Sequence, residues 1–298
     1  MKEKTAHRLP KNPHHLPSAF SLIEVSIILL IIAIIISGII KSNDLHSKAR
    51  LATAQILTQN SPALDVKNLV TWYETSLNKS FINEELQDDG SSISTWYDIS
   101  AEKITRNHAR QTVTDNQPKY YDEIFAKGIP GIKFDGTNDS MDFVSSDLLN
   151  TSYTIFVVEQ RSASDADNYF ISGTGTAANE NLQLGYVSDT SLTHSHIGSS
   201  NSISYALPAY SSNVTRMHSF SFNLGGGKKY WLNGGLLADV DAADNTQSNP
   251  LESFAGAALG KSYNGYLAEI LIFNRVITDK ERQLIEEYLS KKYNIALS

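Results

Sequence analysis

Four oxygen-bearing side chains lie close together in one short segment of the chain. They are Asp135, Asn138, Asp139 and Asp142, within eight residues around Gly136. Calcium takes about six to eight oxygen ligands from carboxylates and carbonyls, so Asp135, Asp139 and Asp142 are candidate calcium ligands. The interpretation we favour is a turn in which these side chains accept hydrogen bonds from their own backbone. No other cofactor is expected.

Two histidines are placed as metal ligands sometimes are. His194 and His196 flank one serine, and residues two apart in a strand share a face, as zinc ligands sometimes do. The sequence identifies no third ligand, so two histidines in a surface loop is the favoured interpretation. The chain has no cysteine, which excludes disulfides and thiolate metal sites.

The carboxylates do not form an evident catalytic pair. Glycoside hydrolysis needs two carboxyl groups on either side of the scissile bond. The acidic stretch 84–89 lies in a polar loop, where solvated charges are expected, and Glu269 stands alone on an apolar run. Three tyrosines could stack on sugar rings, although ordinary packing is favoured for them: Tyr205, Tyr210 and Tyr263. We therefore expect that the chain is not an enzyme.

One further carboxylate, Glu24, interrupts an apolar stretch. Residues 20–40 form a run of 21 residues in which Glu24 is the single charge. A helix of that length spans a hydrocarbon core of about 30 Å. Lys2 to Lys11 precede the run, so the N-terminus is expected in the cytoplasm and the rest of the chain beyond the membrane.

Two interpretations of this stretch explain it incompletely. A secretory signal peptide has a shorter apolar core followed by small residues, whereas here KSNDLHSKAR follows residue 40. A plain signal anchor fits the hydropathy but leaves Glu24 unexplained, because an ionised carboxylate at membrane depth costs roughly 2.5–3.5 kcal/mol without a partner.

The residues around Glu24 resemble a known processing motif. Residues 17–24, PSAFSLIE, are similar to the cleavage and methylation segment of type IV prepilins and type II secretion pseudopilins. The resemblance implies a cytoplasmic leader, 1–19, that a prepilin peptidase removes between Ala19 and Phe20, followed by N-methylation of Phe20. It also implies that Glu24 pairs with the terminal amine of a neighbouring pilin-like subunit. Ala19 departs from the family's more common glycine.

The apolar run is expected to belong to a longer helix. Residues 20–40 would span the membrane and residues 41–59 would continue as an amphipathic segment, with Leu45, Ala49, Ala52 and Ile56 on one face. The sequence Asn-Ser-Pro at 60–62 ends this helix. We therefore place a linker at 60–65 and a separate domain at 66–298.

That domain is expected to be mainly β, with short alternating runs between Gly, Asn, Asp and Ser. Phe220 and Phe222 alternate with serines, which predicts one buried and one solvent-facing side of a sheet. The clearest predicted strands are 131–134, 153–160, 181–187, 218–223, 229–232 and 266–273, with a glycine-rich hairpin at 224–228.

One α-helix is expected at the end of the domain. Thr278 and Glu281 form a capping box. Leu284, Ile285, Tyr288 and Leu289 follow as an apolar stripe that would pack across the edge or back of a sandwich.

Six segments of the domain, in order, resemble one family. They are LVTWY (69–73), TWYDIS (95–100), QPKY (117–120), GIKFDG (131–136), YWLNG (230–234) and GYLAEILIF (265–273). Together they are similar to the concanavalin A-like (LamG-like) jelly-roll domains of bacterial surface proteins. The resemblance implies a β-sandwich that binds carbohydrate or protein, sometimes with calcium. Some members are glucanases, but their E-x-D-x-x-E or E-x-D-x-E strand motif is missing here.

The net charge of the chain argues against one class of partner, nucleic acids. The chain has a formal net charge of −7, residues 1–19 contribute +3, and the remainder therefore stands at −10. Such a surface repels phosphate backbones, so nucleic-acid binding is not expected.

The sequence as a whole predicts a minor pilin or pseudopilin of a type IV pilus or type II secretion system. It would be a single-pass protein of a bacterial inner membrane, with its head outside the cytoplasm for glycan or protein binding in adhesion. The first alternative is an anchored lectin-like binding protein that does not polymerise. The second is an extracytoplasmic glycoside hydrolase.

Overall fold

The computed structural model describes residues 22–86, 88–100, 105–197, 202–241 and 249–298. The chain divides into two compact units, Met1–Leu45 and His46–Ser298. The second unit therefore includes the last part of a helix, whereas the sequence places the start of the domain at residue 66. We refer to residues 46–298 as the head.

Helix α1 runs from Leu22 to Gln59. It ends where the sequence predicts, because Ser61 starts a short 3-10 helix, η1 (Pro62–Leu64), by accepting a hydrogen bond from the amide of Ala63. Ala63 is fully buried, so the predicted linker is packed against the head.

None of the helices in the described part of the chain is both long and apolar enough to cross a membrane.

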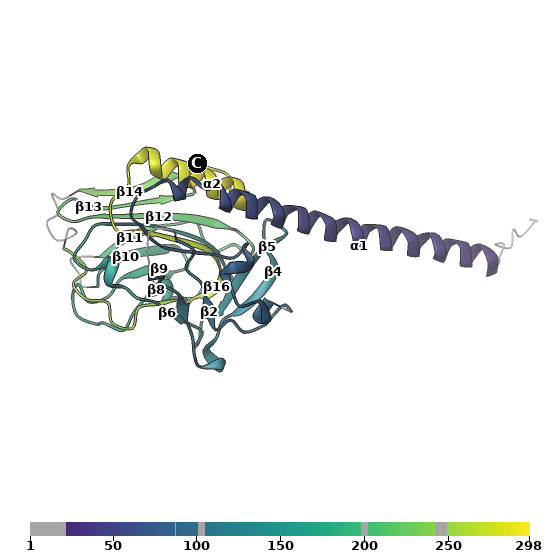
Figure 1. Cartoon of the computed structure of the whole chain (residues 1–298), viewed down its shortest axis with the longest axis horizontal. Helices are drawn as coiled ribbons and strands as arrows, with labels where there is room; N and C mark the ends of the chain where they lie inside the picture. The colour runs from purple at the N-terminus through teal and green to yellow at the C-terminus, as the bar shows by residue number, and fades with distance from the viewer. Residues whose placement is uncertain (1–21, 87, 101–104, 198–201, 242–248) are drawn as a thin grey trace, which may run out of the picture. The chain divides into compact units, whose positions relative to one another are not determined.

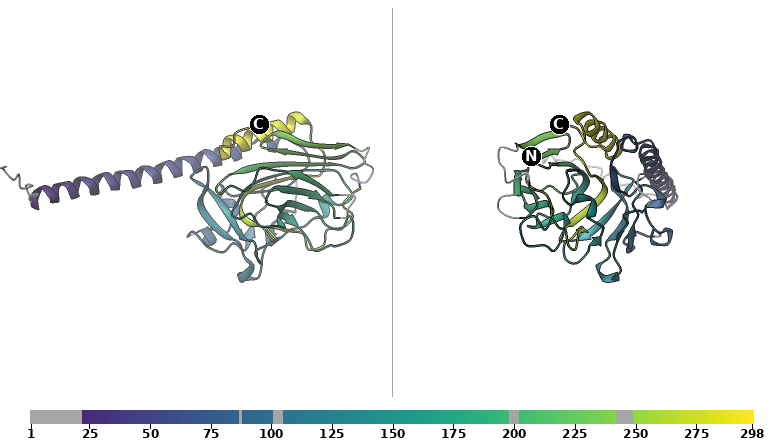
Figure 2. Two further views of the ribbon diagram at one scale, coloured as in Figure 1. Left: turned by 180° about the vertical axis from the view of Figure 1, so that it is seen from behind. Right: turned by 60° about the vertical axis from the view of Figure 1, so that its left-hand side comes forward.

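The head is a sandwich of two antiparallel sheets with eight strands each (Figures 1 and 2). Sheet A has the order β14-β13-β12-β7-β16-β5-β4, and β1 pairs with β16. Its strands are β1 (Leu69–Glu74), β4 (Lys119–Phe125), β5 (Ile129–Asp135), β7 (Tyr153–Arg161), β12 (Arg216–Asn223), β13 (Gly227–Leu232), β14 (Gly235–Asp241) and β16 (Asn264–Phe273).

Sheet B has the order β11-β10-β9-β8-β15-β6-β3-β2. Its strands are β2 (Thr95–Trp96), β3 (Ala109–Arg110), β6 (Met141–Asp142), β8 (Asn168–Ser172), β9 (Gln183–Ser188), β10 (Ser191–Ser195), β11 (Ser202–Ala206) and β15 (Ala258–Leu259). Short 3-10 helices connect some of them: η2 (Asn78–Ser80), η3 (Asn83–Leu86), η4 (Thr114–Asn116) and η5 (Ser146–Leu148).

The predicted strands and hairpin are confirmed. Five of the predicted runs lie on β5, β7, β12, β13 and β16, and the sixth, 181–187, overlaps β9 but begins two residues before it. The β12–β13 hairpin turns at Gly225 and Gly227, whose φ angles of 76° and 92° favour glycine. The prediction of a mainly β sandwich with a C-terminal helix is therefore correct.

The main core lies between the two sheets. Phe220 and Phe222 of β12 are fully buried there. The prediction that the alternating serines face solvent is wrong, because Ser219 is fully buried and Ser221 is 6% exposed. Ser219 donates a hydrogen bond of 2.8 Å to Glu286 of the C-terminal helix, which covers this face of sheet A.

A second core lies between the outer face of sheet A and the helices. Helix α2 (Asp279–Tyr293) begins with the predicted capping box of Thr278 and Glu281. Ile285, Tyr288 and Leu289 are buried in this core with Phe156 of β7, while Leu284 is 41% exposed. Figure 1 shows α2 along the outer side of sheet A. The helix therefore covers the back of the sandwich, one of its two predicted places.

Residues 46–59 of α1 also contribute to the second core. Ala54 and Thr58 are buried, whereas Ala49, Ala52 and Ile56 of the predicted apolar face are exposed. The helix packs through a different face because a hydroxyl, Thr58, finds buried partners on the sandwich. The β4–β5 turn approaches this segment closely, since a Cβ on Gly128 would lie 2.7 Å from the carbonyl oxygen of Ser47.

Candidate functional site

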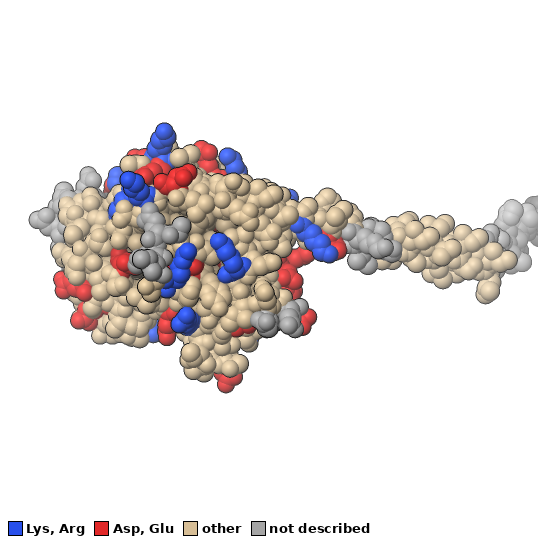
Figure 3. All heavy atoms as spheres, in the orientation of Figure 1, with Lys and Arg blue, Asp and Glu red and all other residues tan. Residues whose placement is uncertain are grey.

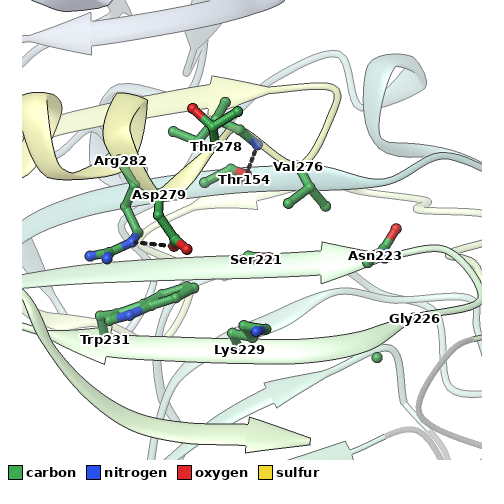
Figure 4. A pocket seen from close by; sticks show the side chains of 12 residues that line it. Thr154, Ser221, Asn223, Gly226, Lys229, Trp231, Val276, Thr278, Asp279 and Arg282 are labelled. Atoms are coloured by element: carbon green, nitrogen blue, oxygen red, sulfur yellow. Dashed lines mark hydrogen bonds and ion pairs between the residues drawn. The ribbon is translucent and has the colours of Figure 1, made fainter. Parts of the chain in front are cut away.

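The outer face of sheet A holds an open pocket at the point where α2 begins (Figure 4). We call it the Trp231 pocket, and its volume is about 310 Å³. It is lined by Thr154, Ser221, Asn223, Gly226, Gly227, Lys229, Trp231, Val276, Ile277, Thr278, Asp279 and Arg282.

Strand alternation and the start of α2 build this pocket. Lys229 and Trp231 are two residues apart on β13, so both face outward, while Tyr230 between them is in the main core. The loop before α2 is fixed to the sheet because the amide of Ile277 donates a 3.2 Å hydrogen bond to the hydroxyl of Thr154.

Arg282 is held rigidly at the pocket. Its guanidinium carbon lies 4.4 Å from the centre of the Trp231 ring, a cation–π arrangement. Its Nη1 donates to Glu286, which also accepts the hydrogen bond from Ser219. Burial raises the pKa of Glu286 despite these two donors. Trp231 and Arg282 are only 6% and 7% exposed, so they form the floor and not the rim.

The pocket has charged side chains that solvent can reach. The side chain of Asp279 is 85% exposed, and its carboxylate lies 3.6 Å from Nε of Arg282. That Nε is buried and has no hydrogen-bond acceptor among the described residues. Lys229 is 46% exposed and pairs at 2.8 Å with Asp239 on β14. A ligand therefore meets an accessible carboxylate and an accessible ammonium.

At the other end of α2, a buried group of charges forms what we call the ionic cluster: Glu74 of β1, Glu269 of β16 and Lys292 of α2. The Lys292 ammonium lies 3.1 Å from Glu74 and 2.8 Å from Glu269, and none of the three side chains is exposed. Lys292 also donates to the Thr58 hydroxyl at 2.7 Å. Glu269 accepts further bonds from Trp72, Tyr288 and Tyr293. Glu269, which stands alone on its run in the sequence, therefore has a cation as its neighbour in the fold.

The ionic cluster is saturated with hydrogen bonds. Burial alone raises the pKa of Glu74, but Lys292 and hydrogen bonds from Ser76, Ser80 and the Leu77 amide outweigh it and hold the pKa below its ordinary value. Such a fully enclosed and fully bonded group has a structural role, since no ligand can reach it.

A second buried network lies between the sheets. Glu159 of β7 accepts hydrogen bonds from Tyr186, Tyr263 and His218. Burial lowers the pKa of His218. For Glu159, burial raises the pKa, but the hydrogen bond from His218 and those from the tyrosines outweigh it, so the pKa lies below its ordinary value. Glu159 is fully buried, so this carboxylate cannot act on a substrate from solution.

The two predicted histidines share a face, but they are buried instead of lying in a surface loop. The Nε2 atoms of His194 and His196 lie 2.7 and 2.8 Å from the Tyr153 hydroxyl. Burial lowers the pKa of His194 well below its ordinary range and that of His196 to about 3. Neutral imidazoles that share one hydroxyl explain the pair without a metal.

The calcium candidates form a turn of the expected kind. Asp135 accepts hydrogen bonds from the amides of Thr137 and Asn138 at 2.8 and 3.2 Å. Asp139 is 5% exposed and accepts from the Asp135 amide at 3.1 Å, whereas Asp142 is exposed on β6. Within the described ranges, no group of three or more His, Cys, Asp or Glu side chains could hold a metal ion.

The remaining predicted site residues are dispersed. Tyr205 and Tyr263 are buried, and Tyr210 is half-buried. Ala19 and Phe20 lie outside the described residues, and for Glu24 only the helical backbone is described. Cleavage, methylation and subunit pairing at these three positions stay predictions.

The sequence contains two local signals for the Trp231 pocket, although the sequence analysis did not combine them. Alternation on 229–232 places Lys229 and Trp231 on one face, and the capping box fixes where α2 begins. What the sequence does not show is that these two segments lie next to each other, because this depends on how α2 packs on sheet A.

No family model matches the chain, and no curated protein does. Among solved structures, it is similar to a Trypanosoma rangeli sialidase in complex with 2,3-difluorosialic acid, with 13% identity and a TM-score of 0.48. That match covers 76% of this chain and 33% of the other, so the chain spans about a third of the sialidase.

Two smaller domains are also similar. The CBM40 of a Ruminococcus gnavus IT-sialidase, bound to α2,3-sialyllactose, has 17% identity and a TM-score of 0.41 over 53% of this chain and 95% of that one. Domain 4 of AbnA, a GH43 extracellular arabinanase from Geobacillus stearothermophilus in complex with arabinotriose, has 16% identity and a TM-score of 0.40 over 74% and 98%. Likeness at this level transfers no ligand or activity to this chain.

Proposed function

We propose that the head binds a glycan in the Trp231 pocket. The observation that carries this proposal is the exposed Asp279 carboxylate, held at the pocket by its 3.6 Å pair with the buried Arg282. A sugar hydroxyl can donate a hydrogen bond to this carboxylate. Lys229 and Ser221 add polar groups around an apolar floor, the usual composition of a small-ligand site.

We also propose that the head is a concanavalin A-like (LamG-like) jelly roll. Supporting this, the six segments that carry the resemblance contribute to both sheets, for example β1, β2, β5 and β16. A lectin-like domain of this kind binds without catalysis, which agrees with the burial of Glu159, Glu74 and Glu269.

A panel of glycans, presented to the full chain with and without calcium, tests the binding proposal. Asp279→Ala and Lys229→Gln should each weaken binding of a retained glycan about tenfold, the usual cost of one charge-assisted hydrogen bond. The control is Glu287→Ala, which removes a half-exposed carboxylate on the same helix. Unchanged affinity in both pocket variants would show that the glycan binds at another site. Turnover of a polysaccharide would overturn the prediction that the chain is not an enzyme.

For the whole chain, we propose a pilin-like subunit that displays this head outside a bacterial inner membrane. The proposal rests on the sequence of residues 17–40: the processing motif, the long apolar run and the single charge of Glu24. Pairing of Glu24 with a neighbour's terminal amine would neutralise a carboxylate that is costly in the membrane. A prepilin peptidase and other pilin-like subunits are the partners this implies.

Two measurements test the subunit proposal. The intact mass of the chain from a peptidase-competent host should correspond to a start at N-methylated Phe20. Glu24→Ala should abolish incorporation into fibres while membrane insertion persists. Normal incorporation of this variant would favour the alternative, an anchored lectin-like protein that does not polymerise.

A further inference from the structure

A second pocket of the head lies between the helical residues 46–54 and the C-terminal end of α2. Its volume is about 260 Å³. It is lined by His46, Ala49, Arg50, Thr53, Ala54, Ile129, Lys291 and Lys292. We call it the basic groove.

The lining of the basic groove has one sign of charge. It contains three cationic side chains, an imidazole and no carboxylate, in a chain whose formal charge after residue 19 is −10. Lys291 is 67% exposed, and its 3.7 Å pair with the exposed Glu287 is a weak surface interaction. Arg50 is exposed as well. Two cations are therefore available to an anion from solution.

The walls of the groove are fixed by packing. Ala54 and Ile129 are buried in the second core, and the ammonium of Lys292 is held by the ionic cluster. Gly128 lets the β4–β5 turn lie against the helix, since a Cβ there would come within 2.9 Å of the Ser47 Cα. A groove of this kind exists before its ligand arrives, which lowers the entropic cost of binding.

We propose that the basic groove binds the phosphate of an anionic phospholipid head group. This inference rests on the proposed membrane anchor, because only residues 41–45 separate the end of the apolar run from His46. A phosphodiester carries one negative charge and only accepts hydrogen bonds, which suits the planar fork of Arg50 and the ammonium of Lys291. Each such cation near an anionic membrane strengthens binding about fivefold.

The full chain in lipid nanodiscs tests the proposal. Native mass spectrometry should show that phosphatidylglycerol is retained in preference to phosphatidylcholine from a mixed disc. The double variant Arg50→Gln/Lys291→Gln should lose about thirtyfold of that preference. Lys280→Gln, which removes an exposed cation from the opposite end of α2, is the matched control and should retain it.

The outcomes separate this inference from the anchor itself. A chain that fails to insert into any disc contradicts the anchor, whereas insertion with equal retention of both lipids overturns only the head-group site. Inorganic phosphate titrated into phosphatidylcholine discs forms the second arm. If phosphate binds there and the double variant loses it, while no lipid preference exists, the source is free phosphate and the lipid assignment is wrong.

Discussion

The two ends of α2 place similar side chains against the same face of sheet A, with opposite results. At the C-terminal end, Lys292 has two carboxylates and a hydroxyl as partners, and the ionic cluster is completely buried. At the N-terminal end, Arg282 has an Nε–H without an acceptor, and the facing Asp279 is 85% exposed.

This difference indicates that residue type alone does not decide whether a charged group is enclosed by the protein or open to a ligand. A buried charge is tolerated when all its bonds are made within the protein, and removing one partner is then expensive. The Asp279 carboxylate at the open pocket can be hydrated, and a ligand there would replace that water. On the face shown in Figure 3, acidic and basic side chains are interspersed over the head, so charge alone does not mark the pocket.

The largest expected effect comes from Lys292→Met. It leaves Glu74 and Glu269 buried without a cation, which should lower the free energy of unfolding by about 3–5 kcal/mol. Urea titration followed by circular dichroism measures this. Lys291→Met, at the exposed neighbouring position, should stay within about 0.5 kcal/mol of the unchanged chain. Equal effects of the two variants would contradict the structural role of the ionic cluster.

The next effect concerns the part of α1 that closes the ionic cluster. A chain that starts at residue 60 lacks Thr58 and the buried Ala54. We expect it to be about 2–4 kcal/mol less stable than a chain that starts at His46, because the Lys292 ammonium loses a partner and apolar surface is uncovered. Thermal unfolding of both chains gives the comparison, and equal midpoints would mean that the head begins after the helix.

A smaller effect is expected at the open end, where Glu281 caps α2. Hydrogen bonds from Arg275, with those from Thr278, hold the pKa of Glu281 at about 2, below its ordinary 4.5. The folded state therefore binds fewer protons than the unfolded state between these values, so the stabilisation is complete above pH 4.5 and is lost as the pH falls towards 2.

Glu281→Gln should accordingly cost about 1–2 kcal/mol at about pH 7, and progressively less in acid. Urea titrations at a series of pH values measure the difference between the two chains. A difference that is constant with pH would show that the cap does not depend on the charge of Glu281.

The smallest effect on stability is expected for Asp279→Ala. Because the side chain is 85% exposed, the free energy of unfolding should change by no more than about 0.5 kcal/mol, mainly through the helix dipole. Glycan affinity should nevertheless fall as described above. Asp279→Ala should therefore lose binding without losing stability, whereas Lys292→Met should lose stability. This contrast tests the comparison between the two ends of α2 most directly. A large loss of stability would assign Asp279 to the fold.

The local elements of the fold were predictable from the sequence. Alternation in 218–223 and the apolar run 266–273 predict strands, and Thr278 with Glu281 predicts the start of α2, because these signals act between residues that are close in the chain. The prediction that Ser219 and Ser221 face solvent was wrong, because helix α2 covers this face of the sheet. That helix lies more than sixty residues further along the chain.

The sites were less predictable because they join distant segments. Lys292 and Glu74 are separated by 218 positions, and their pairing depends on β1 and β16 lying together under α2. His194 and His196 were correctly placed on one face, but their burial follows from the position of Tyr153 on the other sheet. Alternation in the sequence shows which side chains share a face of a strand. Which other element covers that face depends on how the sandwich packs.

The bonds of Lys292 also determine how the head would carry a mechanical load. Tension on residues 46–59 would enter β1 along the backbone through η1, and in parallel would reach Glu269 and Glu74 through the Thr58 hydroxyl and Lys292. These carboxylates stand on β16 and β1, which are paired with each other, and β16 is also paired with β7 and β5. Part of the pull would thus pass directly to strands in the middle of a sheet.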